Sequence, residues 1–205
     1  MLVKKIHDRD LKWLISKIGG CDFDKGPWIA GGAARRLWFD DDWRAGDVDF
    51  FFPNETIFST AKEKCTHLKI WDKMTFNPQP QHVYSSKNAE TYHVQIGRLS
   101  STIATVQLIK NSWHTDIHEL LNGFDFTVCM FACDGDNVYC YQTAVDDCNA
   151  GLLKRTCHST KPVKIRRVIK YNLYGFLADK EIYNELAEQY KDKTLWQGED
   201  DVDYD

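Results

Sequence analysis

One segment constrains the fold of this chain more than any other part of the sequence: residues 28–52, which read WIAGGAARRLWFDDDWRAGDVDFFF. It begins with three apolar residues that predict a short buried strand over 28–30. Two glycines, Gly31 and Gly32, then predict a tight turn into a helix over 33–39. Glycines at such a turn let the backbone approach a ligand closely, and the free N–H groups at the start of a helix attract anions. The turn therefore predicts a binding site for phosphate.

Two aspartates, Asp47 and Asp49, follow at the start of a second predicted strand that ends at residue 52. Side chains at positions i and i+2 of a strand point to the same face, so these two carboxylates lie close together. They repel each other unless a divalent cation lies between them, and Mg²⁺ binds carboxylate and phosphate oxygens together. An Asp-x-Asp pair or a Gly-Gly turn alone also fits an ordinary polar loop. In this order along the chain, the two patterns predict a site in which Asp47 and Asp49 hold Mg²⁺ or Mn²⁺ beside phosphate.

Hydrophobic periodicity and turn residues predict the remaining elements. We expect further helices over 3–18, 55–67, 116–121, 162–176 and 179–192. We expect further strands over 82–84, 92–97, 102–110, 124–133 and 138–141. The first two of these strands pair as a hairpin, and the nearly continuous apolar run 124–133 is typical of a central strand buried on both faces. The order of elements predicts an α/β (α+β) fold, with a mixed sheet flanked by helices and a short C-terminal helical extension.

Composition excludes several classes of protein. The 43% hydrophobic and 13% aromatic content is typical of a globular chain and excludes disorder as a whole. No apolar run is long enough to span a bilayer, and the N-terminus lacks the apolar stretch of a secretory signal. The seven cysteines show no zinc-site spacing, which favours reduced thiols and a cytoplasmic location.

Charge is distributed unevenly along the chain. The formal net charge is −4, but the last seven residues hold five of the 30 acidic side chains and no basic one. The rest of the chain therefore carries 25 acidic against 26 basic side chains. A basic cluster lies between residues 154 and 170 and fits either a surface that faces phosphate or a solvated face.

Several motifs, taken together, resemble a known family. The sequence GGAARR followed by DVD resembles the nucleotidyltransferase signature of the DNA polymerase β superfamily, in the form found in the head domain of class II CCA-adding enzymes and bacterial poly(A) polymerases. Three later segments are similar to family motifs and come in the same order: FDFTVCMFA (124–132), DCNAGLLK (147–154) and PVKIRRVIK (162–170). The resemblance covers residues 25–178. Compact heads of this kind also resemble phage or viral proteins, for which the location would be the host cytoplasm.

Three positions depart from the pattern of the family. Arg36 stands where the family usually has Asp, and Phe124 stands where it usually has Arg. Gln107 stands where many members of the wider superfamily place a third carboxylate.

The resemblance implies roles for individual residues. Asp47, Asp49 and Asp125 are implied to be catalytic, and the first two to hold two Mg²⁺ (or Mn²⁺) ions. A carboxylate in an apolar run needs a polar partner, so Asp125 acts in catalysis or orients Arg35 or a ribose hydroxyl. The implied nucleotide-binding residues are Gly31, Gly32, Arg35, Lys164, Arg167 and Lys170, the last three of which share one helical face.

The function implied is transfer of a nucleoside monophosphate from an NTP to an acceptor hydroxyl, with release of pyrophosphate. We expect the acceptor to be a tRNA-like RNA 3′ end. Alternatives are a toxin-like enzyme that modifies a protein or small molecule, and a non-catalytic nucleotide-binding, RNA-binding or structural protein with the same fold. We expect a nucleotidyltransferase domain over 1–160, a helical neck-like extension over 161–195 and an acidic disordered tail over 196–205, with no membrane partner.

Overall fold

The computed structural model describes residues 1–68, 70–71, 78–79, 82–96 and 102–191. In these ranges the helices are α1 (Arg9–Ile18), α2 (Gly32–Trp38), α3 (Glu55–His67), α4 (Ile117–Asn122), α5 (Gln142–Asn149), α6 (Ile165–Leu173), α7 (Lys180–Tyr190) and the 3-10 turn η1 (Thr127–Cys129). The strands are β1 (Leu2–Lys5), β2 (Trp28–Ala30), β3 (Val48–Phe52), β4 (Ile70–Trp71), β5 (Pro78–Gln79), β6 (His82–Ser85), β7 (Ala89–Gln95), β8 (Ile103–Trp113), β9 (Phe131–Cys133), β10 (Asn137–Cys140), β11 (Leu152–Leu153) and β12 (Leu177–Ala178).

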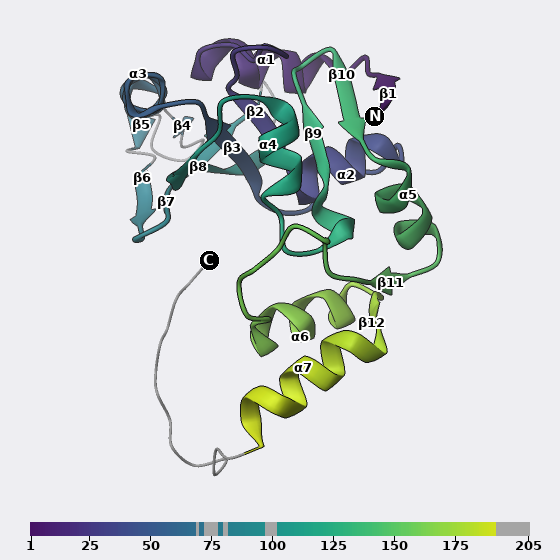
Figure 1. Ribbon diagram of the computed structural model, residues 1–205. Coiled ribbons are helices and arrows are strands. Elements are labelled where there is room, and N and C mark those ends of the chain that lie inside the picture. Colours follow the sequence, from purple (N-terminus) through teal and green to yellow (C-terminus); the bar gives the residue numbers. More distant parts are fainter. Residues whose placement is uncertain (69, 72–77, 80–81, 97–101, 192–205) are drawn as a thin grey trace.

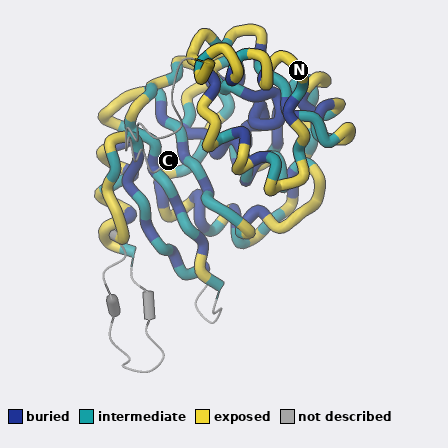
Figure 2. The backbone as a smooth tube through the Cα atoms, turned by 90° about the horizontal axis from the view of Figure 1, so that it is seen from below, coloured by how far each residue is buried: buried dark blue, intermediate teal, exposed yellow. Residues whose placement is uncertain are grey.

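Eight of these strands form one mixed sheet in the order β1-β10-β9-β2-β3-β8-β7-β6. Neighbouring strands are antiparallel except β3 and β8, which run parallel. α3 packs against β3 and β8, and α2 packs against β2 and β9. Figure 1 shows this sheet with its helices around it, and Figure 2 shows buried stretches of backbone in the interior with exposed stretches around the outside. The expected fold class, a mixed sheet flanked by helices, is confirmed.

The alternation of residues in β3 places fully buried side chains on one face of the sheet and half-buried side chains on the other. Val48, Phe50 and Phe52 are fully buried, whereas Asp49 and Phe51 between them are half-buried. Successive side chains of a strand point to opposite faces of the sheet. Asp49 therefore lies on a strand that its apolar neighbours hold in the centre of the molecule.

The N-terminal helix is shorter than predicted. Residues 2–5 form the edge strand β1, which pairs antiparallel with β10. The helix begins at Arg9, because the Asp8 side chain accepts a hydrogen bond from the Leu11 N–H and caps the first turn. The apolar residues near the N-terminus fit the periodicity of a helix as well as that of a strand. Pairing with β10 makes residues 2–5 a strand.

The prediction of one central strand over 124–133 is also wrong. Only β9 is a strand in this run, and η1 interrupts it. The Thr127 hydroxyl donates to Asp147 at 2.7 Å, and the Thr127 N–H donates to the Lys154 carbonyl at 2.9 Å. These tertiary hydrogen bonds turn the backbone out of the sheet, which an apolar pattern alone does not reveal.

α6 and α7 lie together at one end of the molecule (Figure 1). Both are shorter than the helices predicted over 162–176 and 179–192, since α6 begins at Ile165 and α7 ends at Tyr190. They share a second hydrophobic cluster with η1 and β11, and it consists of Phe126, Val128, Cys129, Leu153, Val163, Val168, Tyr171, Ala178, Ile182 and Leu186. The proposed division of the chain at residue 160 stays a prediction, and the tail over 196–205 lies outside the described residues.

The glycine turn between β2 and α2 depends on the backbone of Gly31. This residue has φ 75° and ψ −131°, a combination that side-chain-bearing residues avoid. Its N–H donates to the Phe131 carbonyl at 2.9 Å, which joins the turn to β9. Gly32, in contrast, is the first residue of an ordinary helix.

We expect Gly31→Ala to lower the free energy of unfolding by about 1–3 kcal/mol, because alanine is strained at this φ and ψ. In a protein of this size, each kcal/mol corresponds to about 2–4 °C in Tm. Gly32→Ala is the matched control: its new Cβ would lie 3.5 Å from the flexible Arg36 side chain, and alanine favours a helix. Thermal unfolding followed by circular dichroism should show a lower Tm only for Gly31→Ala. Equal Tm values for the two variants would contradict the assigned strain.

Candidate active site

The structure brings the glycine turn and the aspartate pair together. β2 and β3 are antiparallel, and Ala30 lies opposite Asp49. A Cβ atom added to Gly31 would be 3.9 Å from Asp49 Oδ2. The turn that follows β2 therefore lies beside the carboxylate that β3 carries, although Gly32 and Asp49 are seventeen positions apart in sequence.

Asp49 combines a buried carboxylate oxygen with a raised pKa. Its Oδ1 atom is buried and has no hydrogen-bond partner in the described part of the chain. Burial, and secondly the charge of Asp47, raise the pKa of Asp49 to about 7. A buried carboxylate oxygen without a partner is unfavourable, and a bound cation would supply one. The two carboxylates therefore fit a divalent cation.

The remaining ligands of such a cation would not come from a larger protein cluster. No group of three or more His, Cys, Asp and Glu side chains suited to a metal occurs among the described residues. On the neighbouring strand β8, Gln107 lies in register with Asp49 and adds a neutral amide. A site with two carboxylates leaves coordination positions for phosphate oxygens and water, which is how Mg²⁺ is usually bound with nucleotides.

Charges on two helices act on Asp49. The charges of Lys170 and Arg167 on α6, and of Arg36 on α2, each lower its pKa and so oppose the larger effect of burial. Arg36 lies against Gly46, where an added Cβ would be only 2.7 Å from the guanidinium. In the sequence, Arg36 stands out only as a departure from the family pattern. The sequence feature that could have pointed to Arg36 is Gly46, directly before Asp47, because a glycine there leaves room for the arginine side chain.

Asp125 forms a bidentate ion pair, and its partner is Arg167. The Arg167 Nε and Nη2 atoms donate to the two carboxylate oxygens at 2.6 and 2.8 Å. The predicted need of Asp125 for a polar partner is met, but the suggestion that it orients Arg35 is wrong. The carboxylate raises the pKa of the Arg167 guanidinium, although burial acts in the opposite direction. This pair connects the loop before η1 to α6.

Arg35 points toward the C-terminal helices in this structure. Its guanidinium lies 4.8 Å from the centre of the Phe176 ring and 6.0 Å from that of Tyr171. It also donates to the Val128 carbonyl at 3.4 Å. Cation–π contacts of this kind attach α2 to the second hydrophobic cluster. The described contacts of Arg35 are thus with the second hydrophobic cluster and the residues packed against it.

The three basic residues predicted to share one helical face have different surroundings. Lys164 is the N-cap residue, with extended backbone, so it precedes the helix instead of lying on its face. Arg167 is 28% exposed and paired with Asp125. Lys170 is exposed in the last turn of α6. The prediction of one basic face is therefore wrong for Lys164 and leaves Lys170 as the exposed cation near Asp49.

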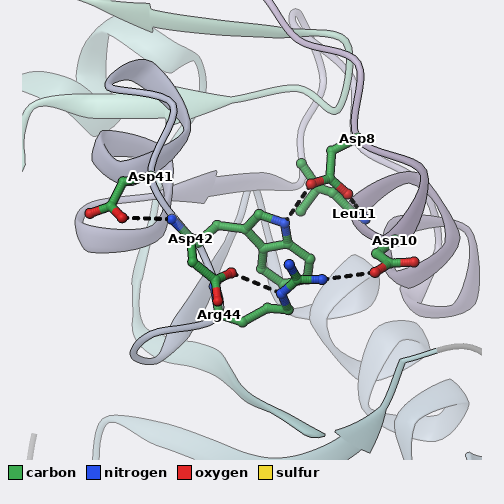
Figure 3. A network of polar contacts seen from close by, with 7 residues as sticks. Asp8, Asp10, Leu11, Asp41, Asp42 and Arg44 are labelled. Atoms are coloured by element: carbon green, nitrogen blue, oxygen red, sulfur yellow. Dashed lines mark hydrogen bonds and ion pairs between the residues drawn. The ribbon is translucent and has the colours of Figure 1, made fainter. Parts of the chain in front are cut away.

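The loop that leads to Asp47 is fixed to the start of α1, as Figure 3 shows. The buried Trp43 indole donates to Asp8 at 2.9 Å. Arg44 forms ion pairs with Asp42 and Asp10, both at 2.8 Å. The same Asp8 caps α1, so one carboxylate joins the helix and the loop. These contacts limit the movement of the backbone ahead of the aspartate pair.

Comparison with solved structures identifies the fold. A CCA-adding enzyme in complex with ATP superposes with a TM-score of 0.60 at 13% identity, over 93% of this chain and 47% of that one. The Thermotoga maritima CCA-adding enzyme complexed with tRNA gives 0.56 at 13% identity, over 93% and 46%. A tRNA-processing enzyme in its apo form gives 0.52 at 16% identity, over 92% and 49%. The fold is that of a nucleotidyltransferase, and the chain spans just under half the length of these relatives.

No described helix is long and apolar enough to cross a membrane.

Two comparisons concern the sequence. No curated protein sequence matches the chain. A family model described as Gabija anti-defense 2 family protein matches residues 2–151. The match contains the glycine turn, Asp47, Asp49 and Asp125, and it ends before α6. Because 150 of its 205 residues match this model, the chain belongs to the Gabija anti-defense 2 family.

Proposed function

We propose that this protein is a metal-dependent nucleotidyltransferase that moves a nucleoside monophosphate from an NTP to an acceptor hydroxyl and releases pyrophosphate. One observation carries the proposal: Asp49, with an unpartnered buried oxygen, lies beside Asp47 and against the Gly31 turn in a nucleotidyltransferase fold. A structural aspartate in such a place would have a hydrogen-bond partner. The missing partner supports a role in binding a cation.

Asp47 and Asp49 would hold Mg²⁺ or Mn²⁺, which when bound neutralises phosphate charge and activates a hydroxyl. The bare backbone at Gly31 and Gly32 lets the triphosphate lie close to these carboxylates. Lys170 supplies an exposed positive charge on the facing helix, whereas Arg167 positions that helix through Asp125. The acceptor oxygen forms a bond to the α-phosphorus. At the same time, the bond between the α-phosphorus and the oxygen that bridges it to the β-phosphate breaks, and pyrophosphate leaves.

We propose an RNA 3′ end as the first candidate acceptor, because one structurally similar enzyme is complexed with tRNA. A second candidate is a component of the defense that gives the family its name, and membership of an anti-defense family favours it. Both fit the same chemistry at Asp47 and Asp49.

All seven cysteines are free, which supports a reducing compartment such as the cytoplasm.

We expect Mg²⁺ or Mn²⁺ together with the correct NTP to raise the Tm. Binding to the folded state stabilises it by mass action, by about 2.7 kcal/mol when the ligand is at 100 times its Kd. The measurement is a thermal shift assay with each NTP at millimolar metal, with EDTA and NTP alone as controls. No shift with any NTP would count against the proposed site.

We expect Asp49→Asn to abolish most of the transfer activity and to stabilise the metal-free protein. Loss of a charge that acts on the transition state reduces rates by about 10²–10³. Because the folded-state pKa of Asp49 is about 7 and its ordinary value is 3.8, the folded parent takes up a proton that the unfolded chain lacks between these pH values. The parent therefore loses stability as pH rises from about 4 to 7. The asparagine variant does not lose it, so its metal-free Tm at pH 8 should be the higher of the two.

Transfer is measured with each α-labelled NTP, Mg²⁺ and total cellular RNA and protein, and the labelled polymer identifies the acceptor. Asp41→Asn is the matched control, since Asp41 is exposed and, among the described residues, its side chain accepts a hydrogen bond only from the neighbouring Asp42 N–H. It should leave both readouts unchanged. An Asp49→Asn protein that melts lower without metal, yet transfers at the parent rate, would refute the catalytic assignment and favour the structural alternative.

We expect neutralisation of Arg167 and of Lys170 to have opposite consequences. Arg167→Gln leaves the half-buried Asp125 without its ion pair, which should cost about 1–3 kcal/mol of stability. Lys170→Gln changes an exposed side chain, so stability should stay within about 0.5 kcal/mol while NTP affinity falls. Urea unfolding and NTP titration on each variant separate the two roles. Unchanged NTP affinity in Lys170→Gln would exclude α6 from the nucleotide site.

A further inference from the structure

Exposed apolar side chains gather on the C-terminal helices. In the part of the chain that the structure describes, seven of the fourteen exposed large apolar residues lie between positions 165 and 190. Three of them, Ile165, Ile169 and Leu173, are spaced by four residues on α6 and are 42%, 52% and 81% exposed. Residues four apart are neighbours on a helix surface, so these three form a continuous row, which we call the α6 stripe.

The α6 stripe is not the face by which the helix packs on the protein. Val168 and Tyr171, on another side of α6, are buried in the second hydrophobic cluster. The fold is therefore complete without the α6 stripe. Apolar rows of this kind on a protein surface usually mark a place where another segment or molecule binds.

Charge next to the α6 stripe restricts what can bind there. Arg166 and Lys170 directly follow Ile165 and Ile169, so the helical turn places them along one edge of the stripe. Both are exposed. A second copy of this chain, docked stripe to stripe, would bring these cations close to their counterparts, which is unfavourable. The surface instead fits an occupant with apolar anchors and acidic side chains.

Such a segment follows α7 in this chain. Residues 192–205 read DKTLWQGEDDVDYD, with six acidic side chains, one basic side chain and the adjacent apolar pair Leu195 and Trp196. The segment begins just after α7, and α7 is held close to the start of α6. Glu185 on α7 accepts a hydrogen bond from the Val163 N–H at 2.9 Å, two residues before α6 begins. Figure 1 shows the two helices side by side.

The length of this segment is sufficient for it to follow the whole stripe. A nine-residue helix such as α6 is about 14 Å long at 1.5 Å per residue. Fourteen extended residues span up to about 46–50 Å, which allows a turn and a return along α6. We propose that residues 192–205 dock on the α6 stripe, with Leu195 and Trp196 on the apolar row and the acidic side chains beside Arg166 and Lys170.

The test is hydrogen exchange of the full-length chain measured by mass spectrometry. We expect Leu195→Ala with Trp196→Ala to speed the exchange of the α6 amides about tenfold, which corresponds to loss of a contact worth about 1.4 kcal/mol. Ile169→Glu, which places an acidic side chain on the exposed stripe, should produce the same change from the other side of the contact. In the parent, raising NaCl from 0.05 to about 0.5 M should also speed exchange, because salt screens the acidic–basic contact.

The matched control is Val83→Ala with Tyr84→Ala, an exposed apolar pair on β6. It should leave α6 exchange unchanged. Exchange that is unaffected by the Leu195 and Trp196 substitutions would overturn the proposal. Protection of α6 that depends on protein concentration and survives those substitutions would overturn it in favour of a second copy. None of these readouts depends on nucleotide transfer.

Discussion

The antiparallel pairing of β2 with β3 is the constraint on which the candidate site depends. It sets Ala30 opposite Asp49, so the chain can turn at Gly31 only by passing directly beside a carboxylate. The backbone of Gly31 occupies a region open to glycine, and its N–H is bound to β9. One register in the sheet thus creates a place where phosphate and two carboxylates can meet.

The rest of the molecule stabilises this unfavourable arrangement. Asp49 lies between buried residues of a central strand, and burial with repulsion from Asp47 raises its pKa to about 7. The loop before Asp47 cannot relieve the repulsion by moving freely, because Trp43 and Arg44 hold it to α1. The packing energy of the hydrophobic cluster around the sheet therefore offsets the unfavourable electrostatic energy at Asp49, as is common at functional sites.

The C-terminal helices contribute both to the site and to a separate surface. Arg167 joins α6 to the loop before η1 through Asp125, and Arg35 joins α2 to the Phe176 ring. These contacts hold Lys170 where its charge acts on Asp49. The same helix carries the α6 stripe, so α6 combines charges that act on Asp49 with an exposed apolar row.

Much of the candidate site could be predicted from sequence because its determinants are local. The order of strand, glycine pair, helix and Asp-x-Asp is a pattern over 25 residues. Asp47 directly precedes β3, which begins at Val48, so its place on the same face as Asp49 stays a prediction from two-residue periodicity. The resemblance to nucleotidyltransferase head domains depends on the same pattern, and the fold confirms it.

Other features depend on contacts between distant parts of the chain, which no local pattern records. The choice of Arg167 over Arg35 as the partner of Asp125 depends on where α6 docks, 42 residues later in the chain. The loss of the predicted strand at Thr127 depends on Asp147, and the strand at residues 2–5 depends on β10. The candidate carboxylates and the glycine turn can be recognised in the sequence, because backbone geometry over a few residues brings them together. The charges that act on them depend on how distant elements pack, because pairing energy depends on distance and burial rather than on order along the chain.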